Sequence, residues 1–276
     1  MTHAPQLMNE DLIFDELREV QNRTHEWGRR NQVEFDPGKE FFCIIHPTKW
    51  SGEDVKLLGT LFDCSLSMQH CIDGILTKIR PKIRALVRLA HLYSPAKMLS
   101  QYKCHIWGLK EYSNGAVIMM VPLHLKRLDK AQRGFLQEIS MTDTEAFIEH
   151  NFAPPSLRRR IGLLGLLHKR VLGKCHPGLV HVLPFAEGLD ANYHNKALEP
   201  FADMQRYQAR LYMRSLFAYI LMYNRLPQAI VDMPSVKSFQ SKLTALAKLR
   251  AQTDQEGWRS SFQNCEEICK MFYSNS

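Results

Sequence analysis

Apolar residues near the start of the chain change from a helical to an extended spacing. Between Asn9 and Gly28 they recur at alternating intervals of four and three, which predicts one amphipathic helix. Residues 31–45, NQVEFDPGKEFFCII, then form two short apolar runs around Asp-Pro-Gly-Lys, where Pro and Gly favour a turn. Residues 55–63, VKLLGTLFD, are a further β-rich run with an internal Gly. We therefore expect strands in this region.

From Ser67 onward the apolar spacing is that of helices. Ser94 followed by Pro95 is the pair expected at a helix N-cap and first turn. Asn114–Gly115 predicts a break, and residues 186–200 predict a linker or long loop. Helices are also predicted at residues 123–139, 144–151, 155–172 with Gly173 as the stop, 210–223 and 236–250. The pattern thus predicts a mainly α (α+β) fold, with a small α+β head and a long helical body.

Composition narrows the class of protein. The 276 residues, 45% of them hydrophobic, suffice for one large domain or two modest ones. No apolar run approaches the ~18 residues of a membrane span, and no secretory signal is visible. Seven scattered cysteines without a Cys-x-x-Cys pair are typical of reduced thiols. We expect an intracellular protein, cytoplasmic or nuclear, without a membrane partner.

Positive charge is concentrated on three predicted helices. The formal net charge is +8 and the pI is about 9.1, which favours a polyanionic partner. A single charged face is usually only solvated, but three in succession make contacts with a nucleic-acid backbone more credible. The candidate nucleic-acid-binding residues are Lys78, Arg80, Lys82, Arg84, Arg88, Lys126, Arg127, Arg158 and Arg159, with Lys130, Arg133 and Arg160 beside them.

Motifs for other chemistry are missing from the sequence. It contains no nucleophile elbow, no phosphate-binding Gly-rich loop and no Asp-Asp pair to hold two metal ions. His168, Cys175 and His176 match no zinc spacing, and Cys265 and Cys269 lack a second ligand pair. We predict no metal site and no cofactor for this chain alone.

Six segments, in order, resemble the reverse transcriptases of non-LTR (LINE-type) retrotransposons, downstream of their catalytic box. They are WGRRNQVEFDPGKEFF, VKLLGTLFDCSLSMQHCID, KIRPKIRALVRL, LDKAQRGFLQEI, APPSLRRRIGLLGLLHKRVLG and YNRLPQAIVDMPSVKSFQSKL. The resemblance covers residues 12–249 and depends on the order and spacing of the segments.

The resemblance implies three parts. Residues 1–68 would be a palm remnant with a primer-grip-like hairpin, residues 69–152 thumb-like helices, and residues 153–276 a helical C-terminal extension. Lys39 would approach the triphosphate of the incoming nucleotide as a vestigial catalytic residue. The primer-grip-like residues would be Leu57, Leu58 and Gly59. The implied partner is a template-primer duplex of RNA or DNA, bound weakly.

The chain departs from the family at the catalytic box. Family members carry an aromatic-Ala-Asp-Asp motif before the helix that corresponds to residues 9–28, and the sequence lacks it. Phosphoryl transfer needs carboxylates that hold Mg²⁺, so Mg²⁺ is implied only for a full-length parent. We expect a truncated polymerase fragment that retains nucleic-acid binding at most and is inactive alone.

Two alternatives stay open. The chain can be a helical interaction or scaffold protein whose basic faces serve solubility, or a decayed transposon fragment that folds poorly because its hairpin lacks a sheet to pair with. The sequence does not fix the oligomeric state.

Overall fold

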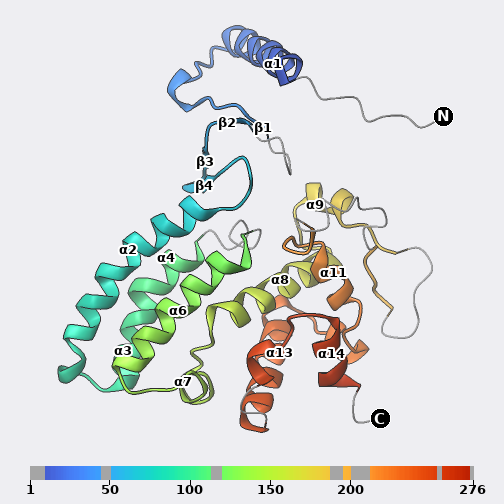
Figure 1. Cartoon of the computed structure of the whole chain (residues 1–276). Helices are drawn as coiled ribbons and strands as arrows, with labels where there is room; N and C mark the ends of the chain where they lie inside the picture. The colour runs from blue at the N-terminus through green and yellow to red at the C-terminus, as the bar shows by residue number, and fades with distance from the viewer. Residues whose placement is uncertain are drawn as a thin grey trace. The chain divides into compact units, whose positions relative to one another are not determined.

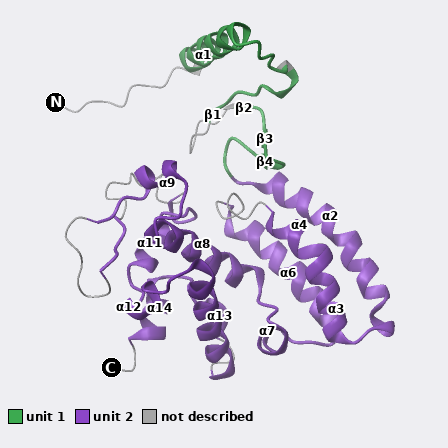
Figure 2. Cartoon of the chain, turned by 180° about the vertical axis from the view of Figure 1, so that it is seen from behind, with its two compact units in different colours: residues 1–66 green, residues 67–276 purple. Residues whose placement is uncertain are grey.

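The computed structural model divides into two compact units, Met1–Leu66 and Ser67–Ser276 (Figure 2). The predicted boundary at residue 68 lies close to this division, whereas the one at residue 152 lies inside the second unit. The fold is mainly helical, with its strands in the first unit, which confirms the predicted class. The structure describes residues 10–44, 51–112, 120–186, 195–199, 212–253 and 257–273.

The first unit contains one long helix and short strands. Its elements are α1 (Glu10–Arg30), the 3-10 helix η1 (Pro37–Lys39), β1 (Cys43–Ile44), β2 (Ser51–Gly52), β3 (Val55–Leu57) and β4 (Thr60–Phe62) (Figure 1). Strand β1 pairs antiparallel with β2, and β3 pairs antiparallel with β4.

The predicted hairpin around Asp36–Lys39 is wrong. Residues 31–36 form no strand, and β1 pairs with β2 instead. The Lys39 amide donates to the Asp36 carbonyl at 2.9 Å, so the turn is a single 3-10 turn. The Val33 amide donates to the Gly28 carbonyl at 2.8 Å. This bond holds the start of residues 31–36 at the end of α1. These residues therefore do not pair with β1 as a strand.

The β3–β4 hairpin follows from its turn residues. Leu57 pairs with Thr60, which leaves Leu58 and Gly59 as a two-residue turn. Their φ angles are +47° and +80°. Two positive φ angles match the twist of antiparallel strands, and Gly tolerates this conformation without a Cβ clash.

The second unit is helical throughout its regular elements. These are α2 (Gln69–Arg88), η2 (Ala90–Leu92), α3 (Pro95–Tyr102), the π-helical η3 (Lys103–Trp107), α4 (Gly108–Glu111), α6 (Pro122–Glu138), α7 (Asp143–His150), α8 (Pro155–Val171), α9 (Pro177–Val182), α11 (Ala218–Tyr223), α12 (Gln228–Val231), α13 (Val236–Thr253), η4 (Gly257–Ser260) and α14 (Cys265–Phe272). Of the five helices predicted from residue 123 onward, four match an observed helix within three residues at each end.

The fifth prediction, residues 210–223, is too long. Helix α11 spans only Ala218–Tyr223 and is preceded by turns at residues 213–217, while residues 210–211 lie outside the described residues. The predicted cap at Ser94 is confirmed, because its hydroxyl accepts from the Lys97 amide at 3.4 Å. Asn114–Gly115 and most of residues 186–200 lie outside the described residues.

Helix α8 is central to the core of the second unit. It packs against α6, α11 and α13 (Figure 1). Its His168 is fully buried: Nε2 lies 2.9 Å from the Met233 carbonyl, and Nδ1 lies 3.0 Å from the Tyr223 hydroxyl. A carbonyl only accepts, so Nε2 carries the proton and Nδ1 accepts from Tyr223. Burial lowers the pKa of His168, which favours this neutral form.

Replacing Gly173 by Ala is expected to destabilise the fold by about 1 kcal/mol, because Gly173 has a φ of +68°. The Gly173 amide donates to the Arg170 carbonyl, and the Lys174 amide to the Lys169 carbonyl, which together form a Schellman cap. The change is measured as the free energy of urea unfolding.

Gly162→Ala is the matched control in the same helix. An added Cβ at Gly162 meets no atom within 4 Å. We expect a gain of about 0.5–1 kcal/mol there, because Ala is the better helix former. Equal losses in the two variants would contradict the role of the Gly173 conformation.

Candidate nucleic-acid interface

A groove of about 800 Å³ lies between α2 and α6, within the second unit. The two helices run side by side in both views (Figure 1, Figure 2). They meet because each presents an apolar stripe to the other. Leu76 is 2% exposed and Phe135 is 1% exposed at the floor of the groove. The rest of the apolar lining is Ile83, Val87 and Ala131.

Five cations line the walls of this groove. Helix α2 contributes Arg80, Arg84 and Arg88, and α6 contributes Arg127 and Lys130. The three α2 arginines recur every four residues, so their Cα atoms lie along one side of the helix over about 12 Å. We call these five residues the basic groove cluster. The structure thus brings together two cationic faces that are 39 or more residues apart in the sequence.

Most of the cluster lacks an internal counter-ion. Among the described residues, no carboxylate lies within 4.0 Å of Arg80, Arg84, Arg88 or Lys130. Arg127 is different, because its Nη2 lies 2.6 Å from Asp73 Oδ1 and so ties α6 to α2. Like charges on facing helices repel one another, and an external anion relieves this repulsion. The cluster is therefore a site where binding of phosphates is electrostatically favoured.

One acidic residue, Glu138, is also part of the lining. It lies in the last turn of α6. Its charge opposes an anion, so the favourable field is strongest nearer the arginines of α2.

The other predicted cations of these helices lie outside the groove. Lys78 and Lys82 on α2 and Lys126 on α6 are exposed and do not line it. The sequence could not separate them from the groove residues, because only the packing of α2 on α6 defines which cations face the groove.

Arg158 and Arg159 are engaged inside the fold. Arg158 Nη2 pairs with Glu111, and its guanidinium carbon lies 3.2 Å from the centroid of the Trp107 ring. Arg159 is 8% exposed, and its Nη2 lies 3.3 Å from Asp129 Oδ1. Both groups already neutralise internal carboxylates, so we do not include them in the interface.

The remaining predicted site residues belong to the first unit. The Lys39 side chain is 82% exposed and lies 3.0 Å from Asp36 Oδ2. Leu57 and Leu58 are exposed on the β3–β4 hairpin, and Gly59 lies in its turn. Lys39 lies on η1 and residues 57–59 lie on the β3–β4 hairpin, both within the first unit.

Sequence analysis missed the buried Lys110 on α4. It is 2% exposed, and its Nζ donates to Gln132 Oε1 at 2.9 Å and to the Tyr102 hydroxyl at 3.3 Å. Burial lowers its pKa to about 7. No sequence pattern distinguishes Lys110 from a surface lysine, because its burial depends on helices that are distant in the chain.

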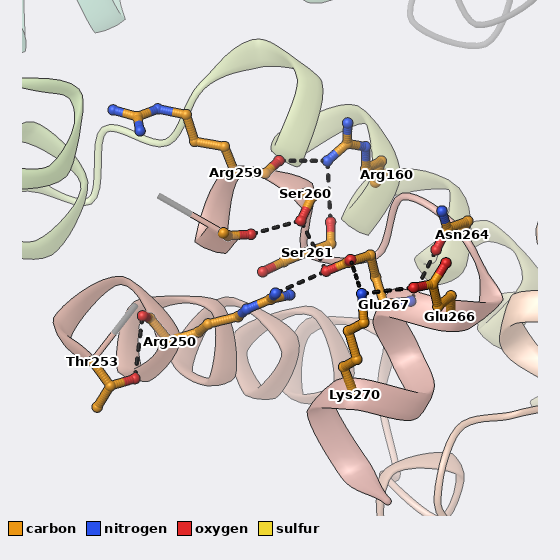
Figure 3. Close-up of polar contacts among 11 residues, drawn as sticks. Arg160, Arg250, Thr253, Arg259, Ser260, Ser261, Asn264, Glu266, Glu267 and Lys270 are labelled. Carbon is orange, nitrogen blue, oxygen red and sulfur yellow. Dashed lines mark hydrogen bonds and ion pairs between the residues drawn. The ribbon is translucent and has the colours of Figure 1, made fainter. Parts of the chain in front are cut away.

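A second polar cluster joins the C-terminal elements of the second unit (Figure 3). Arg160 Nη1 donates to the Arg259 carbonyl at 2.7 Å and to the Ser261 carbonyl at 3.2 Å. Arg250 lies 2.8 Å from Glu267, which also accepts from the Ser260 hydroxyl at 2.8 Å. Every one of these contacts is internal, so the cluster fixes α14 and η4 to α8 and α13.

No metal centre is found within the described ranges. They contain no group of three or more His, Cys, Asp or Glu residues that can hold a metal ion. The residues present there do not fit the paired Mg²⁺ ions of a polymerase.

Comparisons with known proteins give no relative. No protein-family model, curated protein or solved structure matches the chain. Among the helices of the described residues, none is both long enough and apolar enough to cross a membrane.

Proposed function

We propose that the α2–α6 groove binds the phosphate backbone of a template-primer duplex of RNA or DNA. In this proposal the chain is the C-terminal part of a non-LTR retrotransposon reverse transcriptase. The observation that carries the proposal is the basic groove cluster, in which four cations have no carboxylate partner among the described residues. Backbone recognition needs such repeated cations and no special side-chain geometry.

The order of the sequence segments supports the proposed ancestry. Helices α2 and α6 contain KIRPKIRALVR and LDKAQRGFLQE, which are parts of the segments that resemble the thumb region. We propose no polymerase activity for this chain alone, because the sequence lacks the Asp-Asp box that would hold Mg²⁺.

The apolar floor of the groove favours a second candidate function. Leu76, Ile83 and Phe135 lie between the two cationic walls. An acidic amphipathic helix of a partner protein has matching chemistry, with apolar residues for the floor and carboxylates for the walls. In that case the protein is an interaction module.

Salt dependence tests the proposal and separates the two candidates. We expect a labelled RNA–DNA hybrid to bind with an affinity that falls linearly on a logarithmic plot as salt rises. The measurement is fluorescence anisotropy of the hybrid titrated with the full chain. An absence of binding at low salt, or an affinity that salt leaves unchanged, contradicts the proposal. An acidic amphipathic peptide that still binds at ~1 M salt would favour the second candidate, because screening spares the apolar contact.

A further inference from the structure

Helix α1 has an apolar face that the described part of the first unit leaves open. Among the α1 residues whose burial is described, only Gly28 is buried. Val20 is 50% exposed and Trp27 is 56% exposed. A helix in a protein gains most of its stability when its amphipathic face packs against another element. Helix α1 therefore has the character of a helix that packs against a partner.

The first unit packs against a different side of α1. Glu40 accepts a hydrogen bond from Gln21 and lies 2.8 Å from His25 Nε2. The rings of His25 and Phe35 have their centroids 5.5 Å apart. With 3.6 residues per turn, Gln21 and His25 are rotated by about 100° and about 140° from Val20 around the helix axis. A second helix can thus reach the Val20 side without displacing these contacts.

The open face has the spacing of a seam between two helices. Ile13, Leu17, Val20, Thr24 and Trp27 recur at intervals of four and three, as the apolar positions of a coiled coil do over two heptads. The Thr24 hydroxyl donates to the Val20 carbonyl at 2.8 Å, so its polar group is satisfied and its methyl group is free to pack. A stripe of this width fits one further helix.

Charge is divided between the two ends of α1. Residues 10–20 contain five acidic residues and one arginine, whereas residues 21–30 contain three arginines and one glutamate. Two such helices in parallel would place ends of like charge together. In the antiparallel orientation opposite charges meet, and the helix dipoles favour the same orientation. The charge pattern of α1 is therefore complementary to that of a second, reversed copy of itself.

We propose that two copies of the chain associate through their α1 helices, which run antiparallel and cross near Val20. Leu17 of each copy packs against Val20 of the other, and Glu16 at the edge of the seam faces Arg23 of the other copy. Each contact occurs twice about a two-fold axis, so the association closes at a dimer. This inference goes beyond nucleic-acid binding, because it uses no residue of the basic groove cluster.

The existing ion pair of Arg23 does not prevent this contact. Arg23 Nε lies 3.9 Å from Glu19 Oε1 of its own helix, and both side chains are well exposed. Such exposed pairs contribute little to stability. The arginine can therefore face Glu16 of the second copy at little cost.

The size of the surface sets the expected strength. Helix α1 has 21 residues, and two facing helices of this length bury less than the ~1,600 Å² of a standard interface. We therefore expect a reversible dimer with a Kd in the micromolar range. Sedimentation velocity of the full chain between about 1 and about 200 μM covers this range. The average mass is expected to rise from 32.0 kDa towards twice that value. A mass that stays at 32.0 kDa would overturn the proposal.

Two lysine substitutions locate the interface. Val20→Lys places a charge in the middle of the seam and is expected to weaken the dimer by about tenfold or more. Asn22→Lys adds the same charge at an exposed position about 160° away around the helix and is expected to dimerise like wild type. Circular dichroism checks that both variants keep the wild-type helix content. Equal dimerisation of the two variants would show that another surface joins the copies.

A mixing experiment tests the antiparallel orientation. Glu16→Arg places two arginines opposite each other in its own dimer, and Arg23→Glu places two glutamates there, so each variant alone is expected to dimerise several-fold more weakly than wild type. An equimolar mixture restores opposite charges at both contacts and is expected to recover the association, which also shows that both variants are folded. A mixture no tighter than its components would overturn the antiparallel pair.

Discussion

Replacing Arg80, Arg84 and Arg88 together by Gln is expected to weaken hybrid binding on the order of 500-fold at ~0.1 M salt. If each arginine contacts one phosphate, the variant releases three fewer counter-ions, and the slope of log K against log [salt] falls in magnitude by about 2.7. The measurement is anisotropy at several salt concentrations. These arginines line the groove and have no acidic partner among the described residues, so their removal breaks no ion pair there.

The matched control carries the same change in net charge, placed on α2 and α6 but outside the groove. Lys78, Lys82 and Lys126 are exposed but lie outside the groove, and all three are replaced by Gln. We expect this variant to retain most of its affinity. If both triple variants weaken binding equally, general charge rather than the basic groove cluster attracts the hybrid, and the proposed interface is wrong.

The free energy of unfolding is expected to rise by about 1.5 kcal/mol between pH 7 and pH 8.5 through Lys110 alone. Burial lowers its folded pKa from 10.5 to about 7, so the unfolded state binds more protons throughout this window. Stability therefore increases with pH there. Asp129 and Glu111 oppose the shift, and Arg158 and Arg159 reinforce it. The measurement is urea unfolding at each pH.

Two lysine substitutions isolate this effect. Lys110→Met removes the titrating group. Between pH 7 and pH 8.5, we expect the free energy of unfolding of this variant to rise by about 1.5 kcal/mol less than that of wild type. Lys97→Met removes an exposed lysine of α3 and is expected to keep the wild-type slope. The upper limit of pH 8.5 avoids ionisation of tyrosines in the unfolded state, and the ionisation of thiols, whose ordinary pKa is about 8.5, is common to wild type and variant and cancels in the comparison. A wild-type slope in Lys110→Met would show that the buried amine is not the source.

A cooperative unfolding transition is also expected for the C-terminal part of the second unit, since its core is continuous through α8, α11 and α13. It is measured by calorimetry of the full chain. A broad, non-cooperative transition would instead favour the alternative of a decayed fragment that folds poorly.

Local signals predicted part of the fold correctly. The Ser94 cap, the Gly173 stop and the apolar spacing of α6, α8 and α13 each depend on residues within a few positions of one another. The prediction of a hairpin around Asp36–Lys39 failed although both apolar runs have residues suited to strands. The hydrogen bond from the Val33 amide to the Gly28 carbonyl holds the first run at the end of α1.

The sequence by itself determined the helical class, the cationic faces of α2 and α6, and the order of segments that underlies the proposed ancestry. Tertiary structure decided which cations face one groove and which, such as Arg159, neutralise a carboxylate inside the fold. It also buried Lys110 against Gln132. The physical reason is that charge and periodicity are local properties of the chain, whereas burial and ion pairing depend on which distant side chains come into contact.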